Sequence, residues 1–335
     1  MAILVTGGAG YIGSHLVDYL IEKGMKVIVI DNLQTGHREA IHPKAIFYEC
    51  DIRSSEIIMN IFNNEKIEAV FHFAAASLVG ESMNDPLKYY DVNVSGTRSL
   101  LEAMSRHCVK YLVFSSTAAV YGDSHKQPIK ESFPLQPSNP YGETKLAMER
   151  MIKWWGDAFN ASYVSLRYFN AAGAKETGEL GECHLPETHL IPIVLQAALG
   201  MREYVTIYGD KYPTKDGTCI RDFIHVEDLA EAHSMALQYL QNGGKSNVFN
   251  LGNTAGYSVK EVIRASIEET GKNIKVIVGD RRHGDPAELI ACSDKALKIL
   301  GWKPKKSSIH KIIQDAWNWH IKYPEGYKSL SAFQK

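Results

Sequence analysis

The chain has 335 residues, of which 45% are hydrophobic and 22% are charged, and its formal net charge at pH 7 is -1. This length allows a large hydrophobic core and suggests two domains, or one large domain with an appendage. The near-neutral charge gives no electrostatic reason to expect binding to nucleic acid or to a membrane surface. No apolar stretch approaches the roughly 18 residues that a membrane-spanning helix needs.

The cysteines indicate a reducing environment. Five of them are scattered along the chain without a C-x-x-C pair, which is typical of free thiols. Met1 leads directly into an apolar segment, without the charged region, apolar run and cleavage site of a secretory signal. We therefore expect a soluble, cytoplasmic protein.

Short apolar segments alternate with helix-like segments through the first half of the chain. Six strands are predicted, at residues 2–6, 25–30, 45–50, 69–75, 111–115 and 163–169. Four helices are predicted between them. The first ends at about Gly24, the next two span 54–64 and 86–107, and the fourth begins at Pro140. Strands that are apolar throughout and alternate with helices indicate a parallel sheet covered on both faces, which is an α/β fold.

The regular alternation ends at about Asn170. Helices are predicted at 190–200, 227–241 and 259–270, a short strand at 248–251, and long irregular connections between them. Such connections inside a compact chain usually carry function. We expect a smaller, mixed α/β substrate domain over residues 171–335. Residues 221–254 could return to the first domain, because the strand at 248–251 could complete its sheet.

A glycine-rich loop follows the first predicted strand. The pattern Gly8-x-Gly10-x-x-Gly13 allows a tight turn and a close approach of the backbone to a pyrophosphate. The N–H groups and dipole of the following helix N-terminus favour the same ligand. Asp31 ends the second strand, about where a carboxylate reaches the adenosine ribose, which favours NAD over its 2′-phosphorylated form. Residues 1–170 are therefore predicted to form a Rossmann-like, doubly wound NAD-binding domain.

Three further strand ends have residues suited to a cofactor site. Asp51 ends the third strand and could meet the adenine. The small residues after Phe73 would let the backbone lie against the cofactor. Ser115-Ser116-Thr117 ends the fifth strand at the carboxyl edge, where ligands bind in such sheets. A hydroxyl there could bond to the group being oxidised.

Asn139 and Pro140 predict the start of a helix, with Asn139 as the N-cap and Pro140 in the first turn. Tyr141 and Lys145 are then four residues apart and project from the same helical face. A nearby cation lowers the pKa of a phenol from its reference value of about 10. The two residues are therefore candidates for proton transfer, with Thr117 beside the reacting oxygen.

These features together resemble the extended short-chain dehydrogenase/reductase family, and further segments resemble the UDP-glucose 4-epimerase family within it. The narrower resemblance extends nearly from end to end. It rests on Tyr11-Ile12-Gly13-Ser14-His15, Asp31-Asn32-Leu33, Val79-Gly80-Glu81-Ser82, Val120-Tyr121-Gly122, Arg167-Tyr168-Phe169-Asn170, Asp216-Gly217-Thr218 and Arg221-Asp222-Phe223-Ile224-His225-Val226.

The resemblance implies an isomerase of galactose metabolism that interconverts UDP-galactose and UDP-glucose through a 4-keto intermediate. Tyr141 would take the proton of the sugar 4-OH, Lys145 would lower its pKa and bond to the nicotinamide ribose, and Thr117 would hold the 4-oxygen. Hydride would pass to tightly bound NAD and return to the opposite face after the keto sugar turns. The resemblance also implies a homodimer formed through the helix at 86–107 and the Tyr141 helix.

The residues that the resemblance assigns to ligands lie mostly in the loops after the strands. Besides Tyr141 and Lys145, those assigned to NAD are Gly7, Gly10, Tyr11, Ile12, Gly13, Asp31, Asn32, Leu33, Thr35, Gly36, Asp51, Ile52, Phe73, Ala74, Ala75, Ser77, Asn93 and Phe169. Besides Thr117, those assigned to the UDP-sugar are Asn170, His189, Tyr208, Arg221, Arg282, Asp285 and Leu289. Two guanidiniums can neutralise a pyrophosphate, and an aromatic ring can stack on uracil. The alternative for Arg221 is a salt bridge with Asp222.

Five positions depart from the pattern of the family, and one of them is Phe223, where tyrosine is common. Ser77 stands where many members have a lysine, Thr117 where serine is usual, and His189 where asparagine is common. Leu289 is intermediate between the bulky residue of strict glucose/galactose epimerases and the small residue of members that accept N-acetylated sugars. UDP-N-acetylglucosamine, UDP-N-acetylgalactosamine and UDP-xylose therefore stay open as alternative substrates.

Two other functions are weighed against this one. A 4,6-dehydratase would need an Asp-Glu pair where this chain has Ala118-Ala119. An NAD-sensing module without catalysis would have no use for Tyr141 and Lys145. No metal site is predicted, because no histidine shows ligand spacing with a carboxylate or cysteine partner. Residues 183–184 and His189 are expected to serve structure or nucleotide contact.

Overall fold

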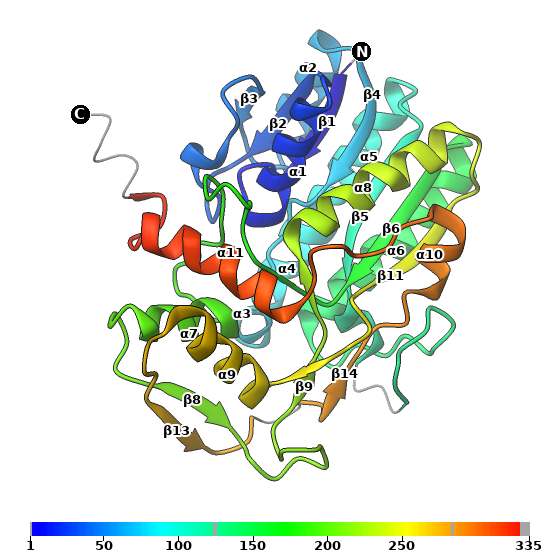
Figure 1. Cartoon of the computed structure of the whole chain (residues 1–335). Coiled ribbons are helices and arrows are strands. Elements are labelled where there is room, and N and C mark those ends of the chain that lie inside the picture. The colour runs from blue at the N-terminus through cyan, green and yellow to red at the C-terminus, as the bar shows by residue number, and fades with distance from the viewer. Residues whose placement is uncertain (1, 123–125, 283–284, 329–335) are drawn as a thin grey trace.

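A computed structural model describes residues 2–122, 126–282 and 285–328. Its centre is a parallel sheet of seven strands, which are β1 (Ala2–Thr6), β2 (Val27–Asp31), β3 (Ile46–Glu49), β4 (Ile67–His72), β5 (Tyr111–Thr117), β6 (Ser162–Tyr168) and β11 (Asn247–Leu251). Their order across the sheet is β11-β6-β5-β4-β1-β2-β3 (Figure 1). The order reverses between β1 and β4, and open α/β sheets bind ligands at such a point.

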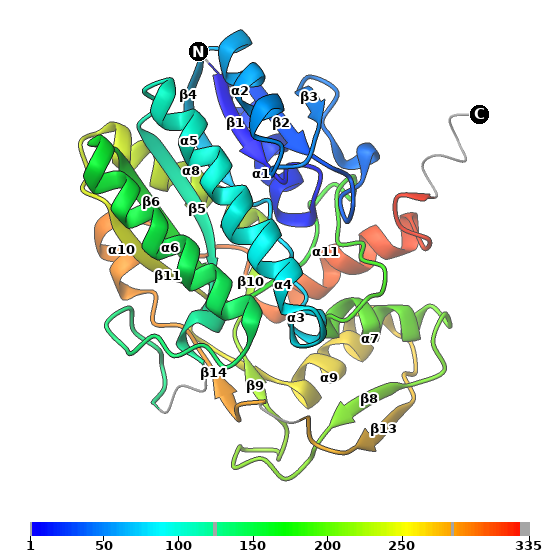
Figure 2. The ribbon, with the colours of Figure 1, turned by 180° about the vertical axis from the view of Figure 1, so that it is seen from behind.

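Helices cover both faces of this sheet. α1 (Tyr11–Glu22) and α8 (Val226–Gln241) lie on one face, and α2 (Ser55–Asn64), α5 (Gly96–Arg106) and α6 (Pro140–Phe159) lie on the other (Figure 2). Because successive strand side chains point to opposite faces, Ile3 and Val5 join the core under α1 and α8, while Leu4 joins the other core. The predicted doubly wound α/β fold is confirmed.

The single helix predicted at 86–107 is wrong in its middle part. α3 (Val79–Asn84) and the short α4 (Pro86–Tyr89) precede a π-helical stretch, Tyr90–Ser95, and α5 follows it. The π-helical stretch contains Asn93, whose fully buried side chain is bonded to the segment after β4. Stretches of this kind are often found at functional sites.

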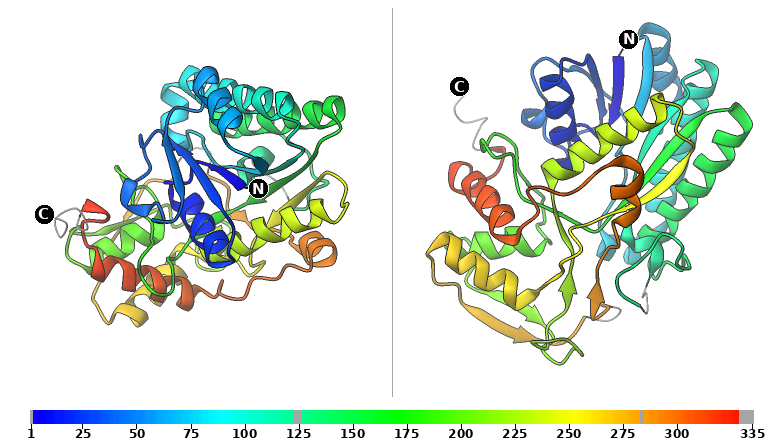
Figure 3. Two further views of the ribbon diagram at one scale, coloured as in Figure 1. Left: turned by 90° about the horizontal axis from the view of Figure 1, so that it is seen from above. Right: turned by 45° about the vertical axis from the view of Figure 1, so that its right-hand side comes forward.

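The second half of the chain adds small elements beyond the carboxyl edge of the sheet (Figures 1 and 3). Its helices there are α7 (Leu190–Ala198), α9 (Val259–Thr270) and α11 (Ile309–Lys322), whereas α10 (Asp294–Leu300) packs beside β11 and α8. Its strands are β7 (Asn170–Ala172) with β10 (Phe223–His225), β8 (Val205–Tyr208) with β13 (Val276–Gly279), and the mixed sheet of β12 (Tyr257–Ser258), β9 (Ile220–Arg221) and β14 (Glu288–Leu289). 3-10 turns cover Arg38–Ala40 and Ala118–Tyr121.

The sequence predicted this half less completely than the first. α7, α8 and α9 are confirmed, and β11 pairs with β6 at the edge of the main sheet. α10 and α11 were not predicted. Figure 3 shows α11, in red, beside α7 and α9, which it contacts. Among the described residues, no helix combines the length and the apolar character needed to cross a membrane.

Candidate active site

The glycine loop between β1 and α1 leaves the start of α1 open to a ligand. Gly7 has a φ of +72°, and a Cβ on Gly13 would lie 2.1 Å from the carbonyl oxygen of Gly7, so the packing requires glycine. α1 starts at Tyr11 after Gly10, and no described side chain caps it or places a carboxylate in its first turn. The N–H groups of such a helix start bind phosphate well. The loop therefore fits the pyrophosphate of NAD.

Asp31, at the end of β2, lies beside this loop. Its Oδ2 accepts the N–H of Ala9 at 3.0 Å, and its Oδ1 accepts the N–H of Leu33 at 2.9 Å. Burial raises the pKa of the Asp31 carboxyl, and the backbone hydrogen bonds oppose that rise. Gly36 packs so closely against Ala9 that a Cβ on it would lie 2.9 Å away, whereas Thr35 is exposed. The loop from 31 to 36 thus lies against the glycine loop, with the carboxylate where the adenosine ribose is expected.

Asp51 is held by neighbouring polar side chains. Nε and Nη2 of Arg53 donate to its two carboxylate oxygens, each at 2.8 Å, and Nδ2 of Asn32 donates to Oδ2 at 3.0 Å. The hydrogen bonds from the Arg53 side chain are the main reason that the pKa of Asp51 lies far below its usual range. Ile52 is buried against Gly96 of α5. The adenine contact of Asp51 stays a prediction.

The segment after β4 approaches the glycine loop closely. The N–H groups of Phe73 and Ala74 both donate to the carbonyl oxygen of Thr6, at 3.0 and 3.2 Å. A Cβ on Gly7 would lie 2.6 Å from the nitrogen of Ala74. The backbone of residues 73–75 is therefore available at the same edge of the sheet as the glycine loop.

Asn93 fixes the next part of this segment. Its Oδ1 accepts the N–H of Ala76 at 2.7 Å, and its Nδ2 donates to the carbonyl oxygen of Ala76 at 3.1 Å. Nδ2 also reaches Oγ1 of Thr144 on α6, at 3.0 Å. Asn93 thus connects the segment to the helix that carries Tyr141. Ser77, which follows, is exposed.

α6 begins with the predicted cap, since Oδ1 of Asn139 accepts the N–H of Gly142 at 2.9 Å. Lys145 is only 3% exposed, and its ammonium donates to the carbonyl oxygen of Ser115 at 2.9 Å. The ammonium also lies 5.0 Å from the ring centroid of Phe114. Burial lowers the pKa of Lys145 to about 7.

Tyr141 and Thr117 meet at the end of β5. The Tyr141 phenol forms a hydrogen bond with the Thr117 side chain, and Oγ1 of Thr117 also accepts the N–H of Ala119 at 3.1 Å. Burial raises the pKa of Tyr141 and outweighs the lowering effect of that hydrogen bond. The expectation that Lys145 lowers the pKa of Tyr141 is therefore wrong for the arrangement of residues that the structure describes. The reason is that the Lys145 ammonium bonds to a main-chain carbonyl and is itself disfavoured by burial.

A buried ion pair behind these residues was not predicted. Nε and Nη2 of Arg167 donate to the two carboxylate oxygens of Glu149 at 2.9 and 2.6 Å. Ser116 donates to the same carboxylate, and Nη1 of Arg167 donates to the hydroxyl of Tyr121 at 2.9 Å. The pair joins β5, β6 and α6 directly behind the site. Its signal in the sequence is Glu149, one helical turn after Lys145 on the same face of α6.

Tyr208, the last residue of β8, lies against Arg282, which follows β13. The Arg282 guanidinium is 3.9 Å from the ring centroid of Tyr208, whose side chain is 42% exposed. A guanidinium over an aromatic face is a favourable cation–π contact. One face of the ring is therefore occupied by Arg282, and a stacked uracil would need the other face.

Arg221 pairs with Asp285 and not with its neighbour Asp222. Nη2 of Arg221 lies 3.4 Å from Oδ1 of Asp285, and Nη1 donates to the carbonyl oxygen of Pro286 at 2.9 Å. The Asp222 carboxylate accepts three backbone N–H groups instead, from Asn253, Thr254 and Ala291. Burial raises the pKa of Asp222 to about 6. The predicted substrate contacts Arg221 and Asp285 are thus in contact with each other.

Leu289 packs near the catalytic helix. It borders a small apolar cluster that Phe169 also contacts and that includes Leu146, the residue after Lys145. It also pairs with Arg221 between β14 and β9. Asn170 starts β7, and its N–H donates to the carbonyl oxygen of Asp222 at 3.0 Å. The structure therefore links several predicted substrate residues through β9 and its neighbours.

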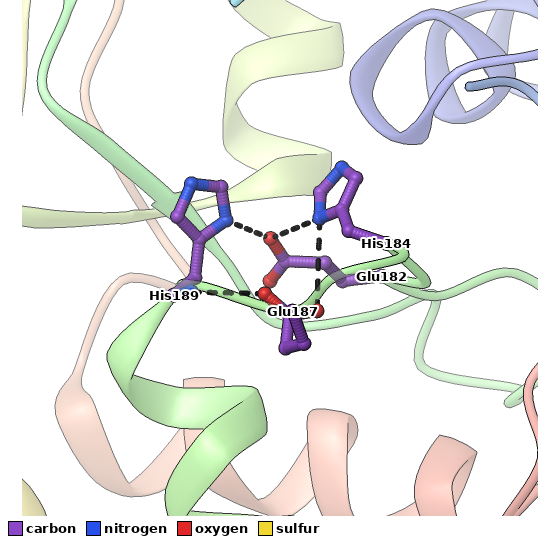
Figure 4. A group of neighbouring side chains, drawn as sticks. All are labelled: Glu182, His184, Glu187 and His189. Carbon is purple, nitrogen blue, oxygen red and sulfur yellow. Dashed lines mark hydrogen bonds and ion pairs between the residues drawn. The ribbon is translucent and has the colours of Figure 1, made fainter. Parts of the chain in front are cut away.

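The loop before α7 brings two histidines and two glutamates together (Figure 4). Nδ1 of His184 lies 3.3 Å from Oε1 of Glu182 and 3.6 Å from Oε2 of Glu187. Nδ1 of His189 contacts Glu182 as well. The expectation that no histidine has a carboxylate partner at ligand spacing is therefore wrong. The pattern Glu182-x-His184-x-x-Glu187-x-His189 was its signal in the sequence.

Known proteins match this chain almost throughout. Residues 3–252 match the model of the NAD dependent epimerase/dehydratase family. A UDP-glucose 4-epimerase from Halalkalibacterium halodurans is 56% identical over 98% of both chains. The crystal structure of a UDP-glucose 4-epimerase has a TM-score of 0.96 at 54% identity, covering 98% of this chain and 99% of that chain. The chain belongs to the UDP-glucose 4-epimerases.

A third relative bears on the cofactor. The crystal structure of UDP-glucose 4-epimerase from Brucella ovis in complex with NAD has a TM-score of 0.92 at 44% identity, covering 94% of this chain and 97% of that chain. This epimerase is thus an NAD-dependent isomerase, as the sequence predicted. The alternative of a non-catalytic NAD sensor is set aside.

Proposed function

We propose that this epimerase interconverts UDP-galactose and UDP-glucose, with Tyr141 as the base that acts on the sugar 4-OH. The observation that carries this proposal is the hydrogen bond between the Tyr141 phenol and the Thr117 side chain at the carboxyl end of β5. It puts a proton acceptor and a hydroxyl donor side by side, on the edge of the sheet where the glycine loop lies.

The residues divide the chemistry between them. Tyr141 as phenolate takes the proton of the 4-OH, and the Thr117 hydroxyl holds the 4-oxygen while its C–O bond becomes a carbonyl. Bound NAD would supply the hydride acceptor and the positive charge of its nicotinamide ring, and the hydride would return to the other face of C4. Tyr141 then returns its proton to the 4-oxygen. One C–H and one O–H bond are broken and remade, so there is no net oxidation.

The positive charge of the nicotinamide ring would lower the pKa of Tyr141. Burial raises the pKa of Tyr141, and Lys145 is bonded to the Ser115 carbonyl. A further positive charge close to the phenol favours the phenolate. We therefore propose that Tyr141 becomes an effective base when oxidised cofactor is bound, with Lys145 bonded to the nicotinamide ribose.

We further propose a division of labour along the chain. Residues 1–170, rejoined by about 221–254, would hold NAD through the predicted loop residues, and 171–335 would hold the UDP-sugar. Arg221 and Arg282 would face the pyrophosphate, and Tyr208 the uracil. Two contacts support this assignment. Arg282 stacks on Tyr208, and Arg221 pairs with Asp285, so the residues proposed to bind the nucleotide are neighbours in the structure.

A homodimer is proposed on the outer face of α5 and α6. Trp154 and Phe159 are 69% and 54% exposed there, whereas Trp155 is buried and belongs to the core. Exposed apolar side chains that line a groove are typical of a protein interface. Cytoplasmic location is also proposed, because the five cysteines are free thiols.

Replacement of Tyr141 tests the proposed function. Tyr141→Phe keeps the ring and removes the base, so turnover of UDP-galactose is expected to fall about 10³-fold or more while bound NAD is retained. Tyr204→Phe, at an exposed tyrosine, serves as the matched control. Near-wild-type turnover in Tyr141→Phe would eliminate Tyr141 as the base.

A further inference from the structure

Four side chains with metal-binding atoms converge in the loop that leads into α7 (Figure 4). They are Glu182, His184, Glu187 and His189, and one ligand atom from each lies within 4.8 Å of the other three. The two glutamates are buried, at 4% and 9% exposure. The side chains point toward one another from a single short segment, so a ligand between them would contact all four.

Two of the distances between these atoms match those around a small bound cation. Zn²⁺ bonded to four ligands at about 2.0–2.2 Å in a tetrahedron would hold the ligand atoms roughly 3.4 Å apart. Nδ1 of His184 lies 3.3 Å from the oxygen of Glu182 and 3.6 Å from that of Glu187. Nδ1 of His189 lies closer than this to the same oxygen of Glu182, in a direct hydrogen bond that a bound ion would replace. Both imidazoles thus present the same ring nitrogen to the cluster.

Backbone hydrogen bonds orient one of the carboxylates. Oε1 of Glu187 accepts the N–H groups of Thr188 and His189, at 2.8 and 2.9 Å. This leaves Oε2 directed at His184. Metal ligands are commonly held in this way by hydrogen bonds from surrounding groups.

In a second group of similar composition, the carboxylates are already paired with lysine ammoniums. His225, Glu227 and Asp315 also lie within ligand distance of one another, but lysine ammoniums already pair with both carboxylates. Lys306 contacts Glu227 at 2.9 Å, and Lys311 contacts Asp315 at 3.1 Å. The ion-pair partners of Glu182 and Glu187 are imidazoles, which bind a divalent metal in their neutral form.

We propose that Glu182, His184, Glu187 and His189 bind one Zn²⁺. Two imidazole nitrogens and two carboxylate oxygens form a donor set that suits Zn²⁺, whereas Mg²⁺ and Ca²⁺ prefer oxygen ligands alone. Four protein ligands make a closed site, which is the arrangement of structural zinc.

The ion would stabilise the contacts between residues 173–189 and the first half of the chain. His37, in the loop after β2, contacts the carbonyl oxygen of Cys183 at 3.0 Å, and Tyr11 at the start of α1 donates to the carbonyl oxygen of Gly173 at 2.7 Å. The ring of Tyr11 also lies edge-on to His184, with 6.3 Å between the ring centroids. A bound Zn²⁺ would fix the loop that these contacts attach to the glycine loop and to α7.

The test uses the full-length protein without a histidine tag, stripped with EDTA and titrated with Zn²⁺ alone. We expect one Zn²⁺ per chain after gel filtration, a Kd of about 1 µM or tighter, and a higher Tm with Zn²⁺ than without it. X-ray absorption at the zinc edge should show two nitrogen and two oxygen ligands at about 2.0–2.1 Å. Absence of stoichiometric Zn²⁺, or a ligand shell containing sulfur, would overturn the proposal.

Variants separate this site from other histidines and thiols. His184→Asn and Glu182→Gln are each expected to weaken Zn²⁺ binding about 100-fold or more. His310→Asn, at an exposed histidine 2.8 Å from Glu269, and Cys183→Ser should bind Zn²⁺ as the wild type does. Unchanged affinity in folded His184→Asn, checked by circular dichroism, would also overturn the proposal. If that variant does not fold, the wild-type absorption spectrum decides.

Discussion

The Lys145 ammonium donates a hydrogen bond to the carbonyl oxygen of Ser115, two residues before Thr117 on β5. This bond ties the first turns of α6 to the end of the strand. Tyr141, one helical turn before Lys145, consequently reaches the Thr117 side chain. The catalytic arrangement thus depends on a contact between a helix and a strand end, which explains why the predicted residues are spread over two segments.

The Thr117 hydroxyl is predicted to be required, and its methyl group dispensable. Thr117→Val preserves the shape but removes the donor to the 4-oxygen, so kcat is expected to fall about 10²-fold. Thr117→Ser keeps the hydroxyl and should stay within about threefold of the wild type. Steady-state kinetics with UDP-galactose checks both. Wild-type kcat in Thr117→Val would show that the hydroxyl has no role in catalysis.

Lys145 is predicted to make the stability of the NAD-free protein depend on pH. Burial lowers the pKa of Lys145 to about 7 in the folded chain, against 10.5 for an ordinary lysine. Between these values the unfolded chain holds a proton that the folded chain lacks, so stability rises with pH by up to about 1.4 kcal/mol per unit. Lys145→Met should lose this rise. Urea unfolding at pH 7 and pH 9 measures it, and identical pH dependence in both proteins would contradict the assignment.

The buried pair of Arg167 and Glu149 is predicted to stabilise the catalytic edge of the sheet. Arg167→Met leaves the Glu149 carboxylate buried without its partner, which costs about 3–5 kcal/mol. Lys275→Met, at the exposed pair of Lys275 and Glu203, is the control and should leave the urea midpoint unchanged. Equal midpoints for the two variants would mean that the buried pair contributes no more than a surface pair.

Leu289 is predicted to limit the size of the sugar. Leu289→Ala should raise the rate with UDP-N-acetylgalactosamine relative to UDP-galactose by about tenfold, because the pocket beside the sugar becomes larger. The C4 epimer is assayed separately with UDP-galactose, UDP-N-acetylgalactosamine and UDP-xylose. Leu297→Ala, at an exposed leucine of α10, is the matched control. An unchanged rate ratio would remove Leu289 as the determinant.

The sequence predicted the parts of the site that depend on local patterns. The apolar run from Ala2 to Val5 predicted the first strand, and the glycines after it predicted the turn that the structure shows. Asn139 acts as the predicted N-cap of α6. These features depend on neighbours within a few residues, which is why they could be recognised without the structure.

Other features depend on contacts between distant segments. The pairing of Arg221 with Asp285 spans 64 residues, and that of Arg167 with Glu149 requires β6 to lie beside α6. The π-helical stretch around Asn93 follows from a bond to Ala76 that the local pattern of 86–107 does not contain. The predicted direction of the pKa shift of Tyr141 was also wrong. Burial raises this pKa, and burial cannot be read from the sequence.

The most direct test of the account follows the hydrogen at C4. The purified epimerase is incubated with UDP-galactose that carries deuterium at C4, in ordinary water, and the UDP-glucose formed is analysed by mass spectrometry and NMR. Transfer of a hydride to a retained cofactor and back predicts that the product keeps its deuterium at C4. Loss of the label to water would contradict the account, since it would require removal of C4 hydrogen as a proton.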